Sequence, residues 1–344
     1  MSVNLFNFGG RVYLTAKMFY ALVRPRLYAK VIGNTIGRAR GLAIPSSAIL
    51  GLTYKCQCQC VHCSAGLYKR DVSDELSTGE WLRLLDDIQG LGVPRVNLSG
   101  GEALLREDIF DIVAHAARYF VVILESNGLK LSLSAARRLK KAGVSCVAVS
   151  IDSTAPKEHD RLRHSDGCFQ HAMEGVANLH EAGVPCIMST YIPAERARAS
   201  YVQGLNKLAR MSHVMALRIL PPRPVGSFSC HVSSLLTEND EKLILKEADP
   251  FMAYFNGMPA PKMCGIFSRA TFYVSPHGDV QPCPFMPIAF GKVRAEGLKV
   301  LLEKMWSHPV FKNEGKKCLV LQESFRNKYL NGRNGYPLDA ASLI

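Results

Sequence analysis

Four cysteines lie within eight residues of this sequence, in the stretch Cys56-Gln57-Cys58-Gln59-Cys60-Val61-His62-Cys63. The stretch follows an apolar run, residues 48–54, that is typical of a buried strand. Cysteines this close in sequence can converge on one metal centre, because a single loop can present several thiolates to it. Zinc usually draws paired ligands from separate segments, and a thioredoxin-like site would need only Cys60 and Cys63. The spacing therefore favours a metal centre held mainly by one loop.

The cysteine content of the whole chain supports a metal rather than a disulfide framework. The chain has 344 residues and eleven cysteines, an odd number, and its first residues do not have the pattern of a secretion signal. Clustered thiols in a reducing compartment usually bind metal. We therefore expect a cytoplasmic protein. Its 48% hydrophobic and 21% charged residues are those of an ordinary globular chain, and no apolar run is long enough to span a membrane.

The net charge of +13 is concentrated near the N-terminus. The first 70 residues hold ten Lys and Arg and no acidic residue, and Asp71 is the first carboxylate. Residues 11–24 have the pattern of a helix with a broad apolar face, interrupted at Pro25. We interpret residues 1–45 as a basic helical extension that packs on the domain. A second interpretation is an interfacial helix that touches the inner membrane surface or guides a lipid-like substrate, and nucleic-acid binding is a third.

From residue 48 to about 221, short β-rich runs alternate with helical patterns. This alternation predicts an α/β fold, with a parallel sheet and helices outside it, either open or as a partial barrel. The expected strands cover 48–54, 95–98, 120–124, 144–151, 185–191 and 215–220, and the expected helices lie near 78–90, 107–118, 132–142, 169–182 and 198–210.

Distinctive polar and glycine clusters follow the first four predicted strands. After the cysteine loop come residues 99–102, Ser-Gly-Gly-Glu, then residues 125–128, Glu-Ser-Asn-Gly, and finally Ser150 and Asp152. Ligands of parallel α/β folds bind at the carboxyl ends of the strands. We therefore expect these clusters to form one site with the cysteines.

The pattern changes after the proline-rich residues 221–226, which we interpret as a domain boundary. The predicted division is a barrel domain over 46–225, a smaller α+β unit over 226–330 and a loosely held tail over 331–344. A hairpin is predicted from 270–274 and 280–281, with Cys264 before it and Cys283 after it. A helix near 297–306 then leads to Cys318.

The motif Cys56-x3-Cys60-x2-Cys63 after a first strand resembles that of the radical S-adenosylmethionine (radical SAM) superfamily. The resemblance implies a partial (β/α)6 barrel whose three thiolates hold a [4Fe–4S] cluster with one open iron. That iron would bind S-adenosylmethionine, whose reductive cleavage gives a 5′-deoxyadenosyl radical that abstracts a hydrogen atom from a substrate. An external electron donor such as flavodoxin or ferredoxin is implied as well.

The same resemblance implies a set of residues that bind S-adenosylmethionine. One group looks like the family's Gly-Gly-Glu segment, where glycines allow close backbone approach. Another looks like its ribose-contacting segment, and a third like the part that holds the methionyl carboxylate. Taken singly, the glycines and Asn127 could belong to plain turns, and Arg163 could be a solvated arginine. The implied residues are Gly100, Gly101, Glu102, Ser126, Asn127, Ser150 and Arg163, with Arg161 as a weaker candidate.

Cys264, Cys283 and Cys318 resemble the start of the auxiliary-cluster domains called SPASM and, when shortened, twitch. The later cysteines of the full SPASM pattern are missing. A second [4Fe–4S] cluster with three thiolates could keep an open iron, or His277, His308 or an oxygen ligand could supply the fourth bond. The alternative is that the three cysteines are unrelated.

The substrate is less determined. A small-molecule, lipid or cofactor-precursor substrate is ranked first, because the basic and aromatic N-terminus suits a hydrophobic or anionic molecule. A ribosomally made peptide follows closely, although residues 1–45 look short for a leader-peptide-binding domain. A nucleic-acid-modifying enzyme and a non-radical electron-transfer protein are the remaining alternatives. Cys230 is a weak candidate for a catalytic hydrogen-atom donor. Among the other cysteines, Cys58 occupies a free position of the motif, Cys146 and Cys186 lie in apolar strands, and Cys168 has no assignment.

Overall fold

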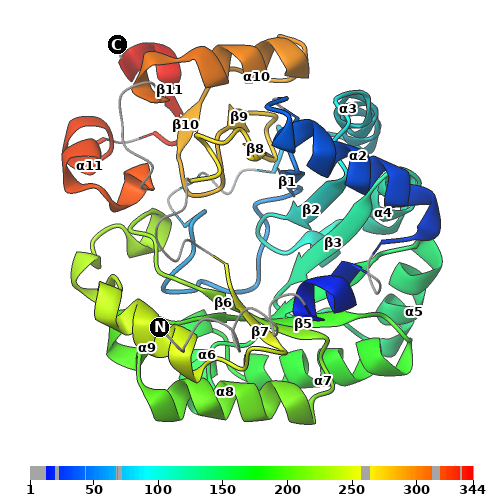
Figure 1. Ribbon diagram of the computed structural model, residues 1–344, viewed down its shortest axis with the longest axis vertical. Helices are drawn as coiled ribbons and strands as arrows, with labels where there is room; N and C mark the ends of the chain where they lie inside the picture. The colour runs from blue at the N-terminus through cyan, green and yellow to red at the C-terminus, as the bar shows by residue number, and fades with distance from the viewer. Residues whose placement is uncertain are drawn as a thin grey trace.

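The structure is a computed structural model that describes residues 13–19, 23–42, 44–66, 68, 72–256, 264–311, 318–333 and 335–343. Within these residues nine strands form one sheet, in the order β7-β6-β5-β4-β3-β2-β1-β8-β9. The sheet curves strongly, and most of the helices cover its outer face (Figure 1). The expected α/β fold of the partial-barrel type is confirmed, with the sheet left open.

All six predicted strands are present and pair in parallel with their neighbours in sequence. Each expected strand differs from the observed one by a few residues at its ends, where chain direction is set by turns rather than by hydrophobicity. Their bounds are β1 (Ser47–Gly51), β2 (Arg95–Ser99), β3 (Val121–Ser126), β4 (Cys146–Ser150), β5 (Cys186–Tyr191) and β6 (Ala216–Leu220).

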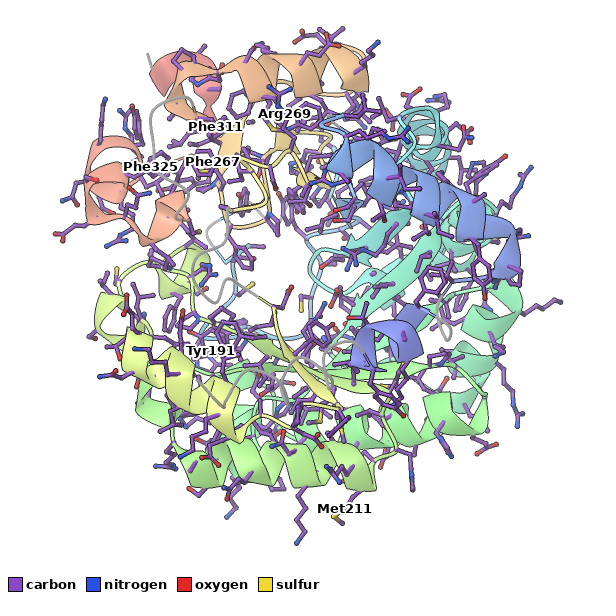
Figure 2. All side chains as sticks on the ribbon, viewed as in Figure 1. Tyr191, Met211, Phe267, Arg269, Phe311 and Phe325 are labelled. Carbon is purple, nitrogen blue, oxygen red and sulfur yellow. The ribbon has the colours of Figure 1, made fainter. Side chains whose placement is uncertain are left out.

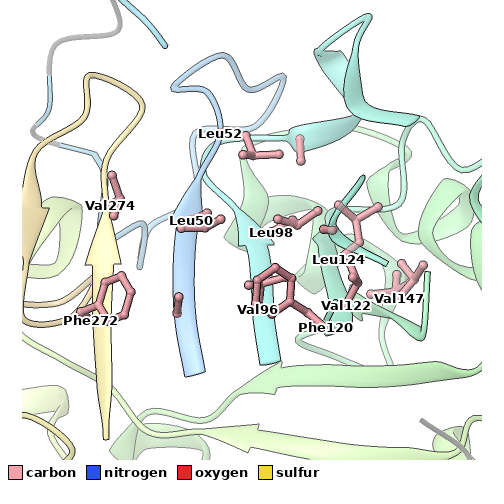
Figure 3. Close-up of a cluster of buried hydrophobic side chains, with 14 of the residues drawn as sticks. Leu50, Leu52, Val96, Leu98, Phe120, Val122, Leu124, Val147, Phe272 and Val274 are labelled. Atoms are coloured by element: carbon pink, nitrogen blue, oxygen red, sulfur yellow. The ribbon is translucent and has the colours of Figure 1, made fainter. Parts of the chain in front are cut away.

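The crossover helices bury one apolar face each against the outer side of the sheet. Trp81, Leu85 and Ile88 of α3 (Thr78–Gly90), for example, are fully buried, and this helix begins with the capping box of Ser77 and Glu80. Figure 3 shows the core that they meet, with side chains of β1, β2, β3 and β8 stacked in rows. The other crossover helices are α4 (Ile109–Ala116), α5 (Leu133–Ala142), α6 (Pro156–Arg163), α7 (Cys168–Glu181) and α8 (Ala199–Met211).

The inner face of the sheet carries a second, smaller core, which the N-terminal segment covers. Leu14, Val23 and Leu27 are buried there against inward side chains of β3 to β6. These inward side chains alternate along each strand with those of the outer core, as a pleated strand requires. They are Val121, Ile123, Cys146, Ala148, Ile187 and Ala216.

The basic residues of the N-terminal segment donate hydrogen bonds to backbone carbonyls at the amino-terminal edge of the sheet. Arg24 binds the carbonyl of Gly143 at 2.9 Å, at the end of α5, and Arg26 binds that of Ala117, at the end of α4. Cations at such positions satisfy the unpaired carbonyls and the negative end of the helix dipole. Lys17, Lys30 and Arg38 do the same for the carbonyls of Met215, Tyr119 and Ile44.

The N-terminal segment therefore packs on the domain, as the first of the three interpretations expected. Nothing in the described residues supports contact with a membrane surface: Leu14, Val23 and Leu27 are buried against the sheet, and five of the cations donate to backbone carbonyls. No helix in the described part of the chain is long and apolar enough to cross a membrane. Residues 1–12 lie outside the described residues.

The sheet continues past residue 225 at both of its edges. Helix α9 (Glu238–Glu247) and strand β7 (Ala253–Phe255) add a seventh parallel strand beside β6. At the other edge β8 (Thr271–Val274) pairs in parallel with β1, and β9 (Val280–Gln281) closes the predicted hairpin. The division at residue 225 stays a prediction, although the hydrogen bonding of the sheet crosses it.

The C-terminal residues differ from the expected loose tail. Helix α10 (Leu298–Ser307) appears as predicted, and α11 (Glu323–Tyr329) follows it. Strand β11 (Leu338–Asp339) then pairs with β10 (Ile288–Ala289), and Leu338 and Ala340 are buried. Figure 2 shows Phe267, Phe311 and Phe325 grouped in this part of the molecule, away from Tyr191 on β5. A few apolar side chains in a polar stretch are enough to hold it.

Replacing Leu27 by Ala tests the packing of the N-terminal segment. The side chain is only 4% exposed, so its truncation should lower the free energy of unfolding by about 2–5 kcal/mol. Ile36→Ala, on an α2 (Tyr28–Ala39) side chain that is 46% exposed, is the control and should change it by less than about 0.5 kcal/mol. Urea unfolding measures both, and equal effects of the two variants would contradict the packing.

Candidate active site

The cysteine loop leaves β1 at the carboxyl end of the sheet and is pressed against the end of β2. The amide of Gly101 donates to the carbonyl of Thr53 at 2.6 Å, and that of Glu102 to Lys55 at 2.8 Å. Gly100 has a φ of +130°, and a Cβ there would lie 2.4 Å from the oxygen of Thr53. The glycines are thus required by the approach of the two backbones, a reason that the sequence did not reveal.

Two further segments hold the loop from its other sides. The amides of Gln59 and Val61 donate to the carbonyls of Arg163 and Leu162 at the end of α6, each at 3.0 Å. The amide of Ser227 donates to the carbonyl of Cys63 at 2.9 Å. The cysteine loop is therefore fixed by backbone hydrogen bonds to three separate parts of the chain.

The structure brings the four cysteines of the loop together and adds a fifth. Cys58, Cys60 and Cys168 form a small buried cluster, against which Cys56 and Cys63 pack. The thiol of Cys58 lies in hydrogen-bonding contact with Cys168, Cys56 and Cys60. Cys168 was missed by the sequence reasoning. Its only signal is its place behind Gly167 at the start of α7, where a helix N-terminus favours a thiolate.

These contacts separate the acidities of the thiols. Hydrogen bonding to its neighbours raises the pKa of Cys58 far above the ordinary value, so that it is the donor of the group. The hydrogen bond from Cys58 lowers the pKa of Cys56 and brings that of Cys60 to about 6, with further help from Arg163 against the effect of burial. Thiolates at these two positions are the form that binds metal.

Nitrogen donors also point at the same sulfur atoms. The side-chain amide of Asn127 lies 3.8 Å from the Sγ of Cys56, and a guanidinium nitrogen of Arg163 lies 3.6 Å from that of Cys60. The backbone amide of Cys58 donates to Cys56 Sγ at 3.4 Å. Asn127 and Arg163 were predicted to bind S-adenosylmethionine, and in the structure both face the cysteine loop.

Glu102 is a buried centre of hydrogen bonds that holds the end of β3. Its carboxylate accepts from the hydroxyl of Ser126 at 3.0 Å, the amide of Asn127 at 2.7 Å and the amide of Leu104. The side chain is fully buried, and burial raises its pKa to about 7. Glu102 thus positions Ser126 and Asn127. Its predicted contact with the ammonium of S-adenosylmethionine stays a prediction.

Arg163 forms a buried ion pair with Asp152, which follows β4. Its guanidinium donates to the Asp152 carboxylate at 2.8 and 2.6 Å. Burial alone would raise the pKa of Asp152, but Arg163 and His62 keep it below its usual value. His62, inside the cysteine motif, stacks on Tyr191 at 4.2 Å between ring centroids, and burial lowers its pKa to about 4. At neutral pH the His62 ring is therefore uncharged, and it serves to pack the loop against Tyr191.

A polar layer lies one step deeper on the inner face of the sheet. Arg218 on β6 donates to both carboxylate oxygens of Glu125 on β3 and to the hydroxyl of Ser189 on β5. Asn97 on β2 donates to the same carboxylate at 3.1 Å. This layer separates the apolar inner core from the strand ends, where Ser150 is half-buried. In the sequence, the sign of this polar layer was an arginine, Arg218, within an otherwise apolar strand.

The second group of thiols also converges. Cys264 and Cys318 are in hydrogen-bonding contact, Cys283 lies close enough to both to interact electrostatically, and all three are half-buried. The hydrogen bond from Cys264 lowers the pKa of Cys318 to about 6. The positive charge of Arg223, just after β6, acts on Cys318 and Cys283. The hairpin β8–β9 brings Cys264 and Cys283 together in the way that the sequence predicted.

The donor chemistry of both groups suits an iron–sulfur cluster. Each offers three thiols with at least one thiolate favoured, and thiolate is the usual protein ligand of such clusters. In the described part of the chain, no three His, Cys, Asp or Glu side chains are arranged to hold a single metal ion. A four-iron cluster instead binds its thiolates at separate iron atoms.

The remaining cysteines lie apart from these groups. Cys146 and Cys186 are buried in strands, and burial raises the pKa of both thiols. Cys230 is exposed, two residues after Phe228, whose ring contacts Tyr191. Its role as a hydrogen-atom donor stays a prediction.

Glu102→Gln tests the buried carboxylate. The folded chain keeps a proton on Glu102 up to about pH 7, whereas the unfolded chain releases it near its ordinary value of 4.5. The stability that this difference contributes is present below pH 4.5 and lost as the pH rises through 7. Between these values the wild type should lose up to ~3 kcal/mol relative to the Gln variant. Urea unfolding of both proteins at several pH values measures it, and a difference independent of pH would contradict the burial effect.

Comparison with known proteins assigns part of the chain to a family. Residues 50–197, which contain the cysteine loop and strands β2 to β5, match the model of the Radical SAM superfamily. A mycofactocin maturase of Mycobacterium tuberculosis is 26% identical over 72% of this chain and 66% of its own length. An AdoMet-dependent heme synthase of Methanosarcina barkeri is 26% identical over 73% and 80%. A PqqA peptide cyclase of Methylocella silvestris is 27% identical over 70% and 68%.

A solved structure shares the fold. SuiB of Streptococcus suis, bound to S-adenosylmethionine, superposes with a TM-score of 0.62 at 13% sequence identity, over 80% of this chain and 69% of its own. The chain spans slightly less than two thirds of the length of the mycobacterial maturase. Residues 50–197 therefore form a radical SAM domain, which in that superfamily binds a [4Fe–4S] cluster and S-adenosylmethionine.

Proposed function

We propose that this protein cleaves S-adenosylmethionine reductively and uses the resulting radical to abstract a hydrogen atom from a peptide substrate. The observation that carries the proposal is the convergence of Cys56, Cys60 and Cys63 on a loop fixed from three sides at the carboxyl end of the sheet. A loop held in this way keeps its thiols in place whether or not they are bound, which is the preorganisation that a metal centre needs.

A bound [4Fe–4S] cluster would supply the open iron that binds S-adenosylmethionine and the electron that breaks its carbon–sulfur bond. Cys56, Cys60 and Cys63 would hold it. Asn127 and Arg163 donate toward two of these sulfur atoms and stabilise their negative charge. Such donors favour the thiolate form that binds iron.

The residues around the loop suit the parts of S-adenosylmethionine. Gly100 and Gly101 leave backbone without side chains at the end of β2, where the amino group of the ligand would find carbonyl acceptors. Ser150 stands half-buried at the end of β4, open to a polar group. Glu102 acts one step away, by holding Ser126 and Asn127 in place.

The convergence of Cys264, Cys283 and Cys318 supports a second, auxiliary cluster. Arg223 would balance part of its negative charge. An auxiliary cluster with three thiolates has one iron open to a further ligand. That ligand could come from the substrate or from a residue such as His308, whose Nε2 is buried and has no hydrogen-bond partner among the described residues.

Charge pairing at the inner face favours a peptide over a polyanionic cofactor precursor. The two described arginines deepest in the site are each neutralised by a carboxylate, Arg163 by Asp152 and Arg218 by Glu125. A molecule with several carboxylates would need cations that are free to pair with it. Neutral polar groups, such as peptide amides, suit the remaining hydrogen-bonding side chains. Among the relatives, the PqqA peptide cyclase points to the same class, whereas the heme synthase points to tetrapyrroles.

Cys60→Ala tests the catalytic assignment. The variant loses one of three cluster thiolates, so formation of 5′-deoxyadenosine from S-adenosylmethionine should fall at least ~100-fold, the upper end of what loss of an outer-shell partner of a metal costs. The assay uses anaerobically reconstituted protein with dithionite and mass spectrometry. Cys186→Ala, a buried strand cysteine outside both groups, is the matched control and should keep the activity.

Iron content accompanies this assay. The wild type should bind about eight irons per chain, and Cys60→Ala about four, because each cubane holds four. Full 5′-deoxyadenosine formation by Cys60→Ala would refute the proposal. If the wild type binds about four irons and still cleaves S-adenosylmethionine, only the proposal of an auxiliary cluster is contradicted.

Binding of iron-coproporphyrin III tests the substrate class. The wild type should not shift the Soret absorbance of this tetracarboxylate at concentrations of about 10 μM, since Arg163 and Arg218 are each paired with a carboxylate. Glu125→Ala, which frees Arg218, should bind it more tightly than the wild type. Tight binding by the wild type would favour the tetrapyrrole class over a peptide.

A further inference from the structure

The cysteine loop has an outer side that faces solvent. Lys55, Gln57 and Gln59 are exposed, and they alternate along the chain with cysteines that are buried or half-buried. The side-chain amide of Asn127 donates to the side-chain oxygen of Gln57 at 3.2 Å, and the amide of Gln59 donates to the carbonyl of Arg163. The outer side of the cysteine loop is therefore held in one form, one residue away from the proposed cluster ligands.

Three exposed cations surround this outer side. Lys55 immediately precedes the first of the four cysteines. Lys130 follows Leu129, whose side chain packs against the group of cysteines. Arg161 lies on α6, two residues before the guanidinium that approaches the sulfur of Cys60 at 3.6 Å. Each cation is thus one or two residues from a residue that either is, or touches, a cysteine of the loop.

These cations are free to meet a partner. In the described part of the chain, none of the three forms an ion pair or a side-chain hydrogen bond. Of the two carboxylates nearest to them in sequence, Asp160 accepts from two backbone amides at the start of α7, at 2.8 and 2.7 Å, and Asp166 is exposed. The outer side of the cysteine loop therefore keeps a net positive charge, whereas Arg163 and Arg218 within the site are neutralised.

We propose that the outer side of the cysteine loop, with Lys55, Lys130 and Arg161 around it, docks an acidic protein that carries one electron. This inference rests on the proposed function, which needs an external source of electrons. Opposite charges speed the encounter of two proteins and orient them. Electron transfer weakens steeply with distance, and a partner docked here stands within a residue or two of the thiols. The carrier is oxidised by one electron and the cluster is reduced by one.

The test measures how fast reduced flavodoxin, an acidic one-electron carrier, reduces the full-length, anaerobically reconstituted protein. The variant is Lys55→Glu combined with Lys130→Glu, and Arg161 stays because it was a candidate for binding S-adenosylmethionine. The second-order rate, followed by the loss of visible absorbance, should fall about tenfold at low salt, since two attractive charges become repulsive. The affinity for flavodoxin should fall by a similar factor. Both differences should vanish near ~1 M salt, where charges are screened.

The matched control reverses two exposed lysines that lie elsewhere and form no ion pair in the described part of the chain. Lys207→Glu on α8 combined with Lys299→Glu on α10 changes the net charge by the same amount and should keep the wild-type rate and affinity. Dithionite, a small reductant that needs no docking surface, should reduce all three proteins to the same extent. Equal reduction by dithionite shows that the loop variant still folds and holds its cluster.

Equal rates with flavodoxin for the wild type and the loop variant overturn the inference, and so do equal losses in the control variant. A wild-type cluster that accepts electrons from dithionite, and from neither flavodoxin nor ferredoxin, overturns it as well. If only the affinity for an acidic peptide falls in the loop variant, the cations serve the substrate instead, against the inference. A wild type that forms no 5′-deoxyadenosine even with dithionite would refute the proposed function.

Discussion

The contact on which the site depends is the close approach of residues 53–55 to the Gly100-Gly101 backbone. Any side chain at Gly100 or Gly101 would collide with the carbonyls of Thr53 or Lys55, at 2.4 and 2.2 Å from its Cβ. This contact sets the direction in which the chain leaves β1, and the cysteine loop starts one residue later. The loop then meets α6 and the turn at residues 226–227, which hold its remaining length. Two glycines just after β2 thus determine where the thiols that follow β1 lie.

The second constraint is the positive charge of the chain. At both edges of the sheet, positive side chains are bound by oxygen atoms of the protein itself. At the amino-terminal edge, cations of the N-terminal segment satisfy carbonyls at helix ends. At the carboxyl edge, Arg163 and Arg218 are paired with carboxylates. A strongly basic composition therefore does not imply a basic binding surface. The first 70 residues supply much of the charge, yet five of their described cations donate to backbone oxygen atoms.

The sequence was sufficient for the parts of the fold that follow from hydrophobic periodicity. Strands β1 to β6 are short apolar runs between turn residues, and the polar clusters after them meet at one edge because parallel strands all end there. Composition misled where a few residues outweigh it. The polar C-terminal stretch, predicted to be a loose tail, is held by Leu338, and β7 and β8 continue the sheet beyond the proline-rich residues 221–226, where the domain boundary stays a prediction. Cys168 was invisible because it comes to the site through helix packing, which no spacing encodes.

The pairing of β8 with β1 places the two groups of cysteines beside neighbouring strands of one sheet. Cys56 follows β1, and Cys264 and Cys283 flank the hairpin whose first strand is hydrogen-bonded to β1. Their separation is therefore set by adjacent strands of one sheet, rather than by a flexible linker between domains. The positive charge of Arg223 acts on both groups: it acts to lower the pKa of Tyr191 beside the cysteine loop and of Cys283 and Cys318, against the effect of burial.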